Sequence, residues 1–184
     1  MTPLTSHLAQ SPVVPAAVAP QPEPRRLART GHRSRGVAII EFAFVFPFLL
    51  ILFFSLIDFG IYFFDQHTLQ FATREGARIG LVGRQLTAGG NVLSREASIV
   101  QTIQNFAAIA INPAKLSISI YPVDAASLND PVGWKGTQDA GDAGAYMRVR
   151  TQYTYKFITP FVAQVMNNGA LVIQAEATYR NETF

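Results

Sequence analysis

The 184-residue sequence contains no cysteine, and this absence excludes disulfide bonds and thiolate metal sites. Charged residues are also scarce, at 15% of the chain, whereas apolar residues make up 49%. A chain of this length has room for one modest folded domain beside a membrane segment. That domain must be stabilised by packing alone.

The chain is equally poor in catalytic motifs. Of three histidines only His67 lies beyond residue 36, and there is no H-E-x-x-H, G-x-S-x-G or G-x-x-x-x-G-K-[ST]. Asp139 and Asp142 suit a plain turn better than a calcium loop, because the D-x-D-x-D-G-x5-E pattern is missing. We therefore expect no enzyme, metal, cofactor or small-molecule substrate.

The positive charge is concentrated at the N-terminus. Residues 1–36 hold five arginines against one acid, whereas residues 37–184 hold ten basic and eleven acidic groups. A basic folded face is therefore absent, and we expect no nucleic-acid partner. Six of the 11 prolines lie in residues 1–24, which predicts that residues 1–36 form a disordered leader. Its arginines are Arg25, Arg26, Arg29, Arg33 and Arg35.

A run of 21 residues, Val37 to Ile57, contains one ionisable side chain, Glu41. At about 1.5 Å per residue it matches a hydrocarbon core of roughly 30 Å. It is far longer than the apolar part of a signal peptide, and no small-x-small cleavage site follows it. Arginines before it and Asp58 and Asp65 after it place the N-terminus in the cytoplasm and residues 58–184 outside. Anionic lipid headgroups are the expected partners of the arginines.

Past Ile57 the pattern turns amphipathic, which extends the predicted helix to about residue 82. Its apolar positions are Ile61, Phe64, Leu69, Ala72, Gly76 and Ile79. Gly83 and the pair Gly89-Gly90 end this helix. A second amphipathic helix is expected over about 92–110, with an apolar stripe of Val92, Ile99, Ile103, Phe106 and Ala110.

Three later segments alternate apolar and polar residues, which predicts strands with one buried face. They run from Leu116, Met147 and Leu171, and the long segment 124–144 is expected as an irregular loop. The predicted class is α+β. A long N-terminal helix, first transmembrane and then amphipathic, carries a small antiparallel sheet packed on its outer half.

Residues 36–80 resemble the TadE-like family of the tight-adherence (Tad) pilus systems. Gly36-Val37-Ala38-Ile39-Ile40-Glu41-Phe42 matches the type IV prepilin pattern, with glycine before the cut and glutamate fifth in the mature chain. The stretches Glu41–Pro47 and Ala72–Arg78 are also similar to the family. Phe42 stands where the major Flp pilins typically have tyrosine, which favours a minor subunit.

The resemblance implies a pilin-like fold and a minor pilin-like subunit, or pseudopilin, of the bacterial inner membrane. A prepilin peptidase would cut it between Gly36 and Val37, and it would serve assembly of a Tad/Flp-type pilus in adhesion or secretion. Its further partners would be inner-membrane lipids, other Tad pilus subunits and the assembly platform. The implied subunit or assembly contacts are Glu41, Phe42, Pro47, Arg74, Glu75, Gly76 and Arg78.

The residues themselves leave alternatives open. Glu41 either pairs with an ammonium group at Val37 after cleavage or reaches the headgroups as a free acid. Gly76 and its small neighbours predict close packing within or between subunits, while Arg74 and Arg78 suit either a solvated face or a contact. The alternative function is an uncleaved single-pass anchor or scaffold of the cell envelope. A tethered envelope enzyme is a weaker third hypothesis.

Overall fold

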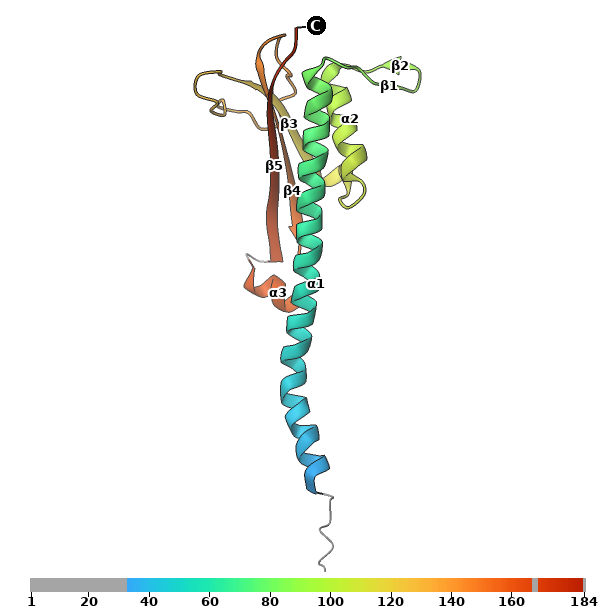
Figure 1. The fold of residues 1–184 in the computed structure, drawn as a ribbon, viewed down its shortest axis with the longest axis vertical. Coiled ribbons are helices and arrows are strands. Elements are labelled where there is room, and N and C mark those ends of the chain that lie inside the picture. The colour runs from blue at the N-terminus through green and yellow to red at the C-terminus, as the bar shows by residue number, and fades with distance from the viewer. Residues whose placement is uncertain (1–32, 167–168, 184) are drawn as a thin grey trace, which may run out of the picture. The chain divides into compact units, whose positions relative to one another are not determined.

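A computed structural model describes residues 33–166 and 169–183 (Figure 1). Most of the predicted leader, including Arg25, Arg26 and Arg29, lies outside the described residues. The described residues divide into two units, one that ends at Glu41 and one that begins at Phe42. The elements are the helices α1 (Arg33–Leu81), α2 (Arg95–Ala107) and α3 (Pro160–Val165), a 3-10 turn (Pro113–Lys115), and the strands β1 (Thr87–Ala88), β2 (Asn91–Val92), β3 (Leu116–Val123), β4 (Tyr146–Lys156) and β5 (Ala170–Arg180).

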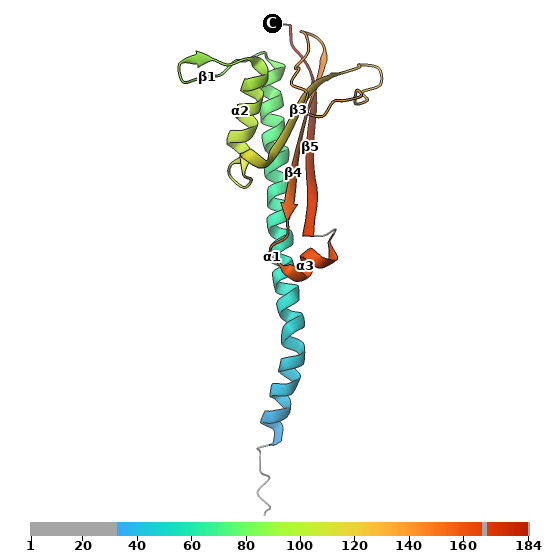
Figure 2. The same ribbon diagram turned by 180° about the vertical axis from the view of Figure 1, so that it is seen from behind.

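The predicted α+β class is confirmed. Strands β3, β4 and β5 form an antiparallel sheet in that order, with Ile120 opposite Val149 and Val149 opposite Ala177. Two opposite views place α1 alongside the three strands and α2 alongside the C-terminal part of α1 (Figures 1 and 2). The sheet therefore packs on the C-terminal half of the long helix.

The buried face of α1 differs in part from the predicted stripe. Leu69 and Ala72 are fully buried as predicted, but Phe64 is 55% exposed and Asp65 only 5% exposed. Asp58 and Asp65 lie two helical turns apart, in line with Leu69, so the sheet covers them instead of Phe64. On this face the Thr73 hydroxyl lies 2.6 Å from that of Thr151 and links α1 to β4.

The end of α1 follows a Schellman motif. Gly83 has a φ of +61°, its N–H donates to Gly80 and the N–H of Arg84 donates to Ile79. The predicted start of the next helix at Val92 is wrong, because Gly89-Gly90 turns the chain into the β1–β2 hairpin and leaves Val92 67% exposed. Helix α2 begins at Arg95, and Ser94 caps it because its side chain accepts a hydrogen bond from Ala97 N–H.

The expectation of a single buried face is wrong for β3. Tyr121 is 1% exposed and Ser119 is 2% exposed, although both alternate with the core residues Ile118 and Ile120. The long segment 124–144 folds back over this second face, where Gly136 N–H donates to Ser119 Oγ at 2.9 Å. An alternation pattern cannot reveal that a loop will cover the polar side of a strand.

Candidate functional site

The segment that resembles a prepilin cleavage site lies in the first turns of α1. Because the helix begins at Arg33 rather than at Val37, the peptide bond between Gly36 and Val37 is helical. Residues 36–41 are exposed, and apart from the neighbouring residues of the helix itself no heavy atom lies within 4 Å of the position that a Cβ would take at Gly36. The peptide bond is therefore open on the helix surface.

An exposed apolar surface follows this segment. By length and composition, the helix Gly36–Leu81 can cross a membrane, and Pro47 lies inside it without ending it. Phe42 is 58% exposed, with its ring 5.0 Å from that of Phe46. The other large side chains that α1 leaves exposed include Ile39, Phe44, Phe48, Leu52, Phe53 and Leu56.

The second family-like stretch, Ala72–Arg78, contains small residues that let α2 approach α1. A Cβ added at Gly76 would lie 2.3 Å from Ile103 Cγ1 and 3.1 Å from the Ile99 carbonyl oxygen. At Gly80 it would lie 2.5 Å from Ile99 Cδ1. Gly76 therefore packs within the chain, which is one of the two roles predicted for it.

The charged members of this stretch remain accessible. Arg74 and Arg78 are exposed and Glu75 is half-buried. Glu75 and Arg78 line an open groove of about 480 Å³ between α1 and α2, whose apolar lining includes Phe106. The charged side chains of Glu75 and Arg78 therefore lie next to apolar surface in this groove. Its full lining is Glu75, Arg78, Ile79, Val82, Arg84, Thr102 and Phe106.

Asp58 connects α1 to the segment after β4. It is fully buried, and its carboxylate accepts hydrogen bonds from the backbone N–H groups of Ile158 (3.1 Å) and Thr159 (2.9 Å). The Tyr155 hydroxyl donates to the Asp58 carbonyl oxygen at 3.1 Å. From the sequence, Asp58 indicates only the topology of the chain, because these partners lie about 100 residues away.

A second connection, the Asp130 clamp, consists of Asp130, Tyr121, Arg148 and Arg150 and holds the 124–144 loop on the sheet. Asp130 accepts from Arg148 (2.6 Å), Arg150 (2.5 Å) and the Tyr121 hydroxyl (2.8 Å). Arg150 also stacks 4.6 Å from the Trp134 ring centroid.

The clamp changes the titration of its members. Burial alone would raise the pKa of Asp130, but hydrogen bonds from Tyr121, Arg148 and Arg150 lower it below its ordinary value. Burial, together with the hydrogen bond to Asp130, raises the pKa of Tyr121 to about 12. Asp130 therefore stays ionised and Tyr121 neutral near neutral pH, and this suits a structural clamp.

Other charged candidates also have structural partners. Arg150 pairs with Glu176 on the neighbouring strand β5 at 2.5 Å. Asp139 accepts a hydrogen bond from Gly141 N–H at 2.8 Å and thereby closes a turn. Within residues 33–166 and 169–183, no three histidine, aspartate or glutamate side chains gather in a way that could hold a metal ion.

Comparison with known protein families identifies a segment near the start of the chain. A family model described as "TadE-like protein" covers residues 36–78, from the glycine of the prepilin-like pattern to Arg78. No curated protein matches the chain, and no solved structure does. Residues 36–78 are therefore a TadE-like segment, in agreement with the resemblance found in the sequence.

Proposed function

We propose that this protein is a minor pilin-like subunit, a pseudopilin, that serves assembly of a Tad/Flp-type type IV pilus. The TadE-like match over residues 36–78 carries the proposal, because it begins at Gly36 and includes both Glu41 and the Arg74–Arg78 stretch. Among the described residues, one helix is long and apolar enough to cross a membrane, and this supports a single-pass membrane protein. We place it in the bacterial inner membrane, with the arginine-rich leader in the cytoplasm and residues 58–184 outside.

Cleavage between Gly36 and Val37 by a prepilin peptidase is the first step of this mechanism. The bond lies in a helical turn, which must unwind to enter a peptidase site. Glycine makes that turn easier to open, because it costs about 1 kcal/mol of helix stability relative to alanine. Cleavage removes Arg33 and Arg35 with the rest of the leader, and so removes the charges that hold the helix at anionic lipids.

Glu41 gains a partner through the same cut. The new ammonium group at Val37 lies four residues before Glu41, which is one helical turn. It pairs with Glu41 of its own chain or of a neighbouring subunit and offsets the cost of a carboxylate in an apolar segment. The groove lined by Glu75 and Arg78 is the proposed contact for another subunit or the assembly platform.

Mass and N-terminal peptide analysis of the protein from native membranes tests the proposal, with a strain lacking the prepilin peptidase as the control. We expect a mature chain that begins at Val37 only when the peptidase is present. A Gly36→Asp form should stay full length and membrane-bound. Normal cleavage of that variant, or an identical N-terminus in both strains, would contradict the pseudopilin function and favour an uncleaved anchor or scaffold.

A further inference from the structure

The segment after β4 exposes apolar side chains that the rest of the domain does not cover. Ile158 is 71% exposed, Phe161 is 50% exposed and Val165 is 68% exposed. Phe161 and Val165 lie one turn apart on α3, and Val162 on its other side is buried in the core. Lys156 and Glu176 are the nearest charged residues in the sequence on either side of this segment.

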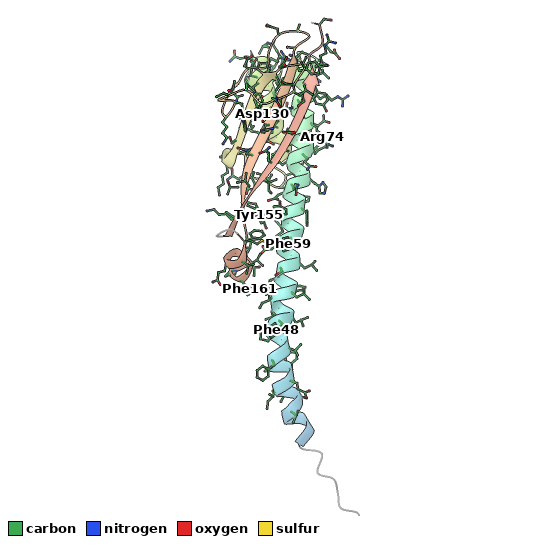
Figure 3. The ribbon with its side chains drawn as sticks, turned by 90° about the vertical axis from the view of Figure 1, so that its left-hand side faces the viewer. Phe48, Phe59, Arg74, Asp130, Tyr155 and Phe161 are labelled. Carbon is green, nitrogen blue, oxygen red and sulfur yellow. The ribbon has the colours of Figure 1, made fainter. Side chains whose placement is uncertain are left out.

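The position of this segment along α1 is fixed by Asp58. The hydrogen bonds from Ile158 and Thr159 to the Asp58 carboxylate hold the start of α3 beside the first residue after the apolar run 37–57. The rings of Phe59 and Phe157 lie 6.0 Å apart and strengthen the same contact. Figure 3 shows Phe161 on the Phe48 side of Phe59, so α3 lies at the level where the predicted span ends.

The exposed side chains at this level are of the kinds expected at a membrane boundary. On α1, Leu56 is 72% exposed and Ile57 is 43% exposed. At this level α1 and α3 therefore both expose apolar side chains. Lys115 and Lys156 are exposed, and both line a shallow hollow formed with residues 153–155 of β4. Apolar side chains flanked by lysines are the pattern of a segment that lies in a lipid interface.

We propose that Ile158–Val165 is a second, interfacial membrane contact. In this arrangement α3 lies in the headgroup region of the outer leaflet, with Phe161 and Val165 among the acyl chains. The segment then sets the depth of α1, and it must leave the lipid before the subunit can be withdrawn from the membrane. The inference rests on the membrane span of the proposed function, but not on cleavage or on entry into a pilus.

A lipid surface explains these observations better than a protein partner does. Ile158, Phe161 and Val165 lie where the span meets the domain, and the hydrogen bonds to Asp58 hold the start of this segment there. At the opposite end of β4, the loop 124–144 exposes the charged residues Asp124, Lys135, Asp139 and Asp142 together with Leu128 and Val132. Since β4 has 11 residues, that end is about 33 Å away at roughly 3.3 Å per residue.

Tryptophan fluorescence of the full-length protein in liposomes tests the proposal. The liposomes contain phosphatidylethanolamine and phosphatidylglycerol, with lipids brominated in the upper part of their acyl chains as quenchers. Trp134 is the native tryptophan, so both proteins carry Trp134→Phe, which keeps a ring beside Arg150. One protein then carries Phe161→Trp, and the matched control carries Val132→Trp, at a fully exposed position of the 124–144 loop.

The brominated lipids should quench the Phe161→Trp indole by about half, because an interfacial helix buries its apolar face roughly 5–10 Å into the lipid. The Val132→Trp control should lose almost none of its emission. Resistance to alkaline extraction, measured on the same liposomes, reports insertion of α1 independently. Strong quenching of the Phe161→Trp protein alone would support the inference.

Other results would overturn it in distinguishable ways. Equal and weak quenching of both proteins, in liposomes that resist extraction, would overturn the contact of α3 with lipid but leave the span intact. A blue shift of the Phe161→Trp emission that grows with protein concentration in detergent, without quenching in lipid, would assign the surface to a second copy of the chain. Release of the protein by alkaline extraction would overturn the span together with this inference.

Discussion

At the scale of single residues, Asp130 shows how one carboxylate positions an irregular loop. It accepts hydrogen bonds from Tyr121 and from two arginines of β4, while its own backbone belongs to the loop 124–144. The guanidinium groups of Arg148 and Arg150 are mostly covered, with side-chain exposures of 12% and 11%. Loss of the carboxylate would leave both cations without this partner in a poorly hydrated site.

The Asp130 clamp predicts an acid-sensitive contribution to stability. The folded state lowers the pKa of Asp130, so it binds this proton less tightly than the unfolded chain does. The contribution is therefore complete above the ordinary aspartate pKa of about 3.9 and is lost as the pH falls through the lowered folded value. Asp130→Asn should lose on the order of 2 kcal/mol at pH 7, and the difference from wild type should shrink below about pH 4.

Denaturant unfolding in detergent, followed by Trp134 fluorescence over a pH series, measures this difference. Asp142→Asn is the matched control, because Asp142 is an exposed acid of the same loop whose backbone carbonyl, rather than its carboxylate, accepts from Asn181. A pH-independent difference for Asp130→Asn would show that the clamp does not act through its charge.

Residues of this kind mark the limit of prediction from the sequence. The prepilin-like pattern around Glu41 could be read directly, because its residues are neighbours in the chain. The roles of Asp58 and Asp65 could not, because their burial depends on a sheet that lies far along the sequence. The N–H groups that donate to Asp58 belong to Ile158 and Thr159, which follow β4 in the chain. No local sequence pattern indicates such a pairing.

At the scale of elements, the contact between α1 and α2 depends on glycine at position 76. Gly76→Ala should be destabilising, because its methyl group would overlap Ile103 and also approach the Ile99 carbonyl oxygen. Overpacking typically costs about 1–3 kcal/mol, which exceeds the gain of about 1 kcal/mol in helix propensity. Thermal unfolding followed by circular dichroism should show a lower midpoint.

Gly60→Ala is the control for this contact. Gly60 lies in the same helix, but apart from the neighbouring residues of the helix itself no heavy atom lies within 4 Å of the position that its Cβ would take. Here the gain in helix propensity acts alone, and the midpoint should rise. If both substitutions changed the midpoint in the same direction, α2 would not pack closely at Gly76.

The elements themselves were predictable where one periodic pattern dominated. The long helix and the three alternating strands follow from local spacing, and the structure contains them. The β1–β2 hairpin does not follow from periodicity, because the pair Gly89-Gly90 suits both the end of a helix and a tight turn. Because the hairpin occupies residues 87–92, α2 begins only at Arg95, where Ser94 supplies the cap.

At the scale of the whole molecule, the distribution of charge predicts a single orientation in the membrane. Five arginines precede the apolar run, and the residues after it are nearly balanced in charge, so the N-terminus should stay in the cytoplasm. The absence of cysteine allows a clean test, because any introduced thiol is the only one. Ser11→Cys marks the leader and Val132→Cys marks the exposed loop of the domain.

A membrane-impermeant maleimide applied to spheroplasts distinguishes the two sides. The strain should lack the prepilin peptidase, so that a cut at Gly36 cannot remove the leader and its label. Val132→Cys should react in intact spheroplasts, whereas Ser11→Cys should react only after lysis. Labelling of both thiols before lysis would rule out a span at residues 37–57, and the reverse pattern would show that the leader arginines do not set the topology. Because α3 is held beside Asp58, the expected pattern would also place Phe161 at the outer rather than the cytoplasmic leaflet.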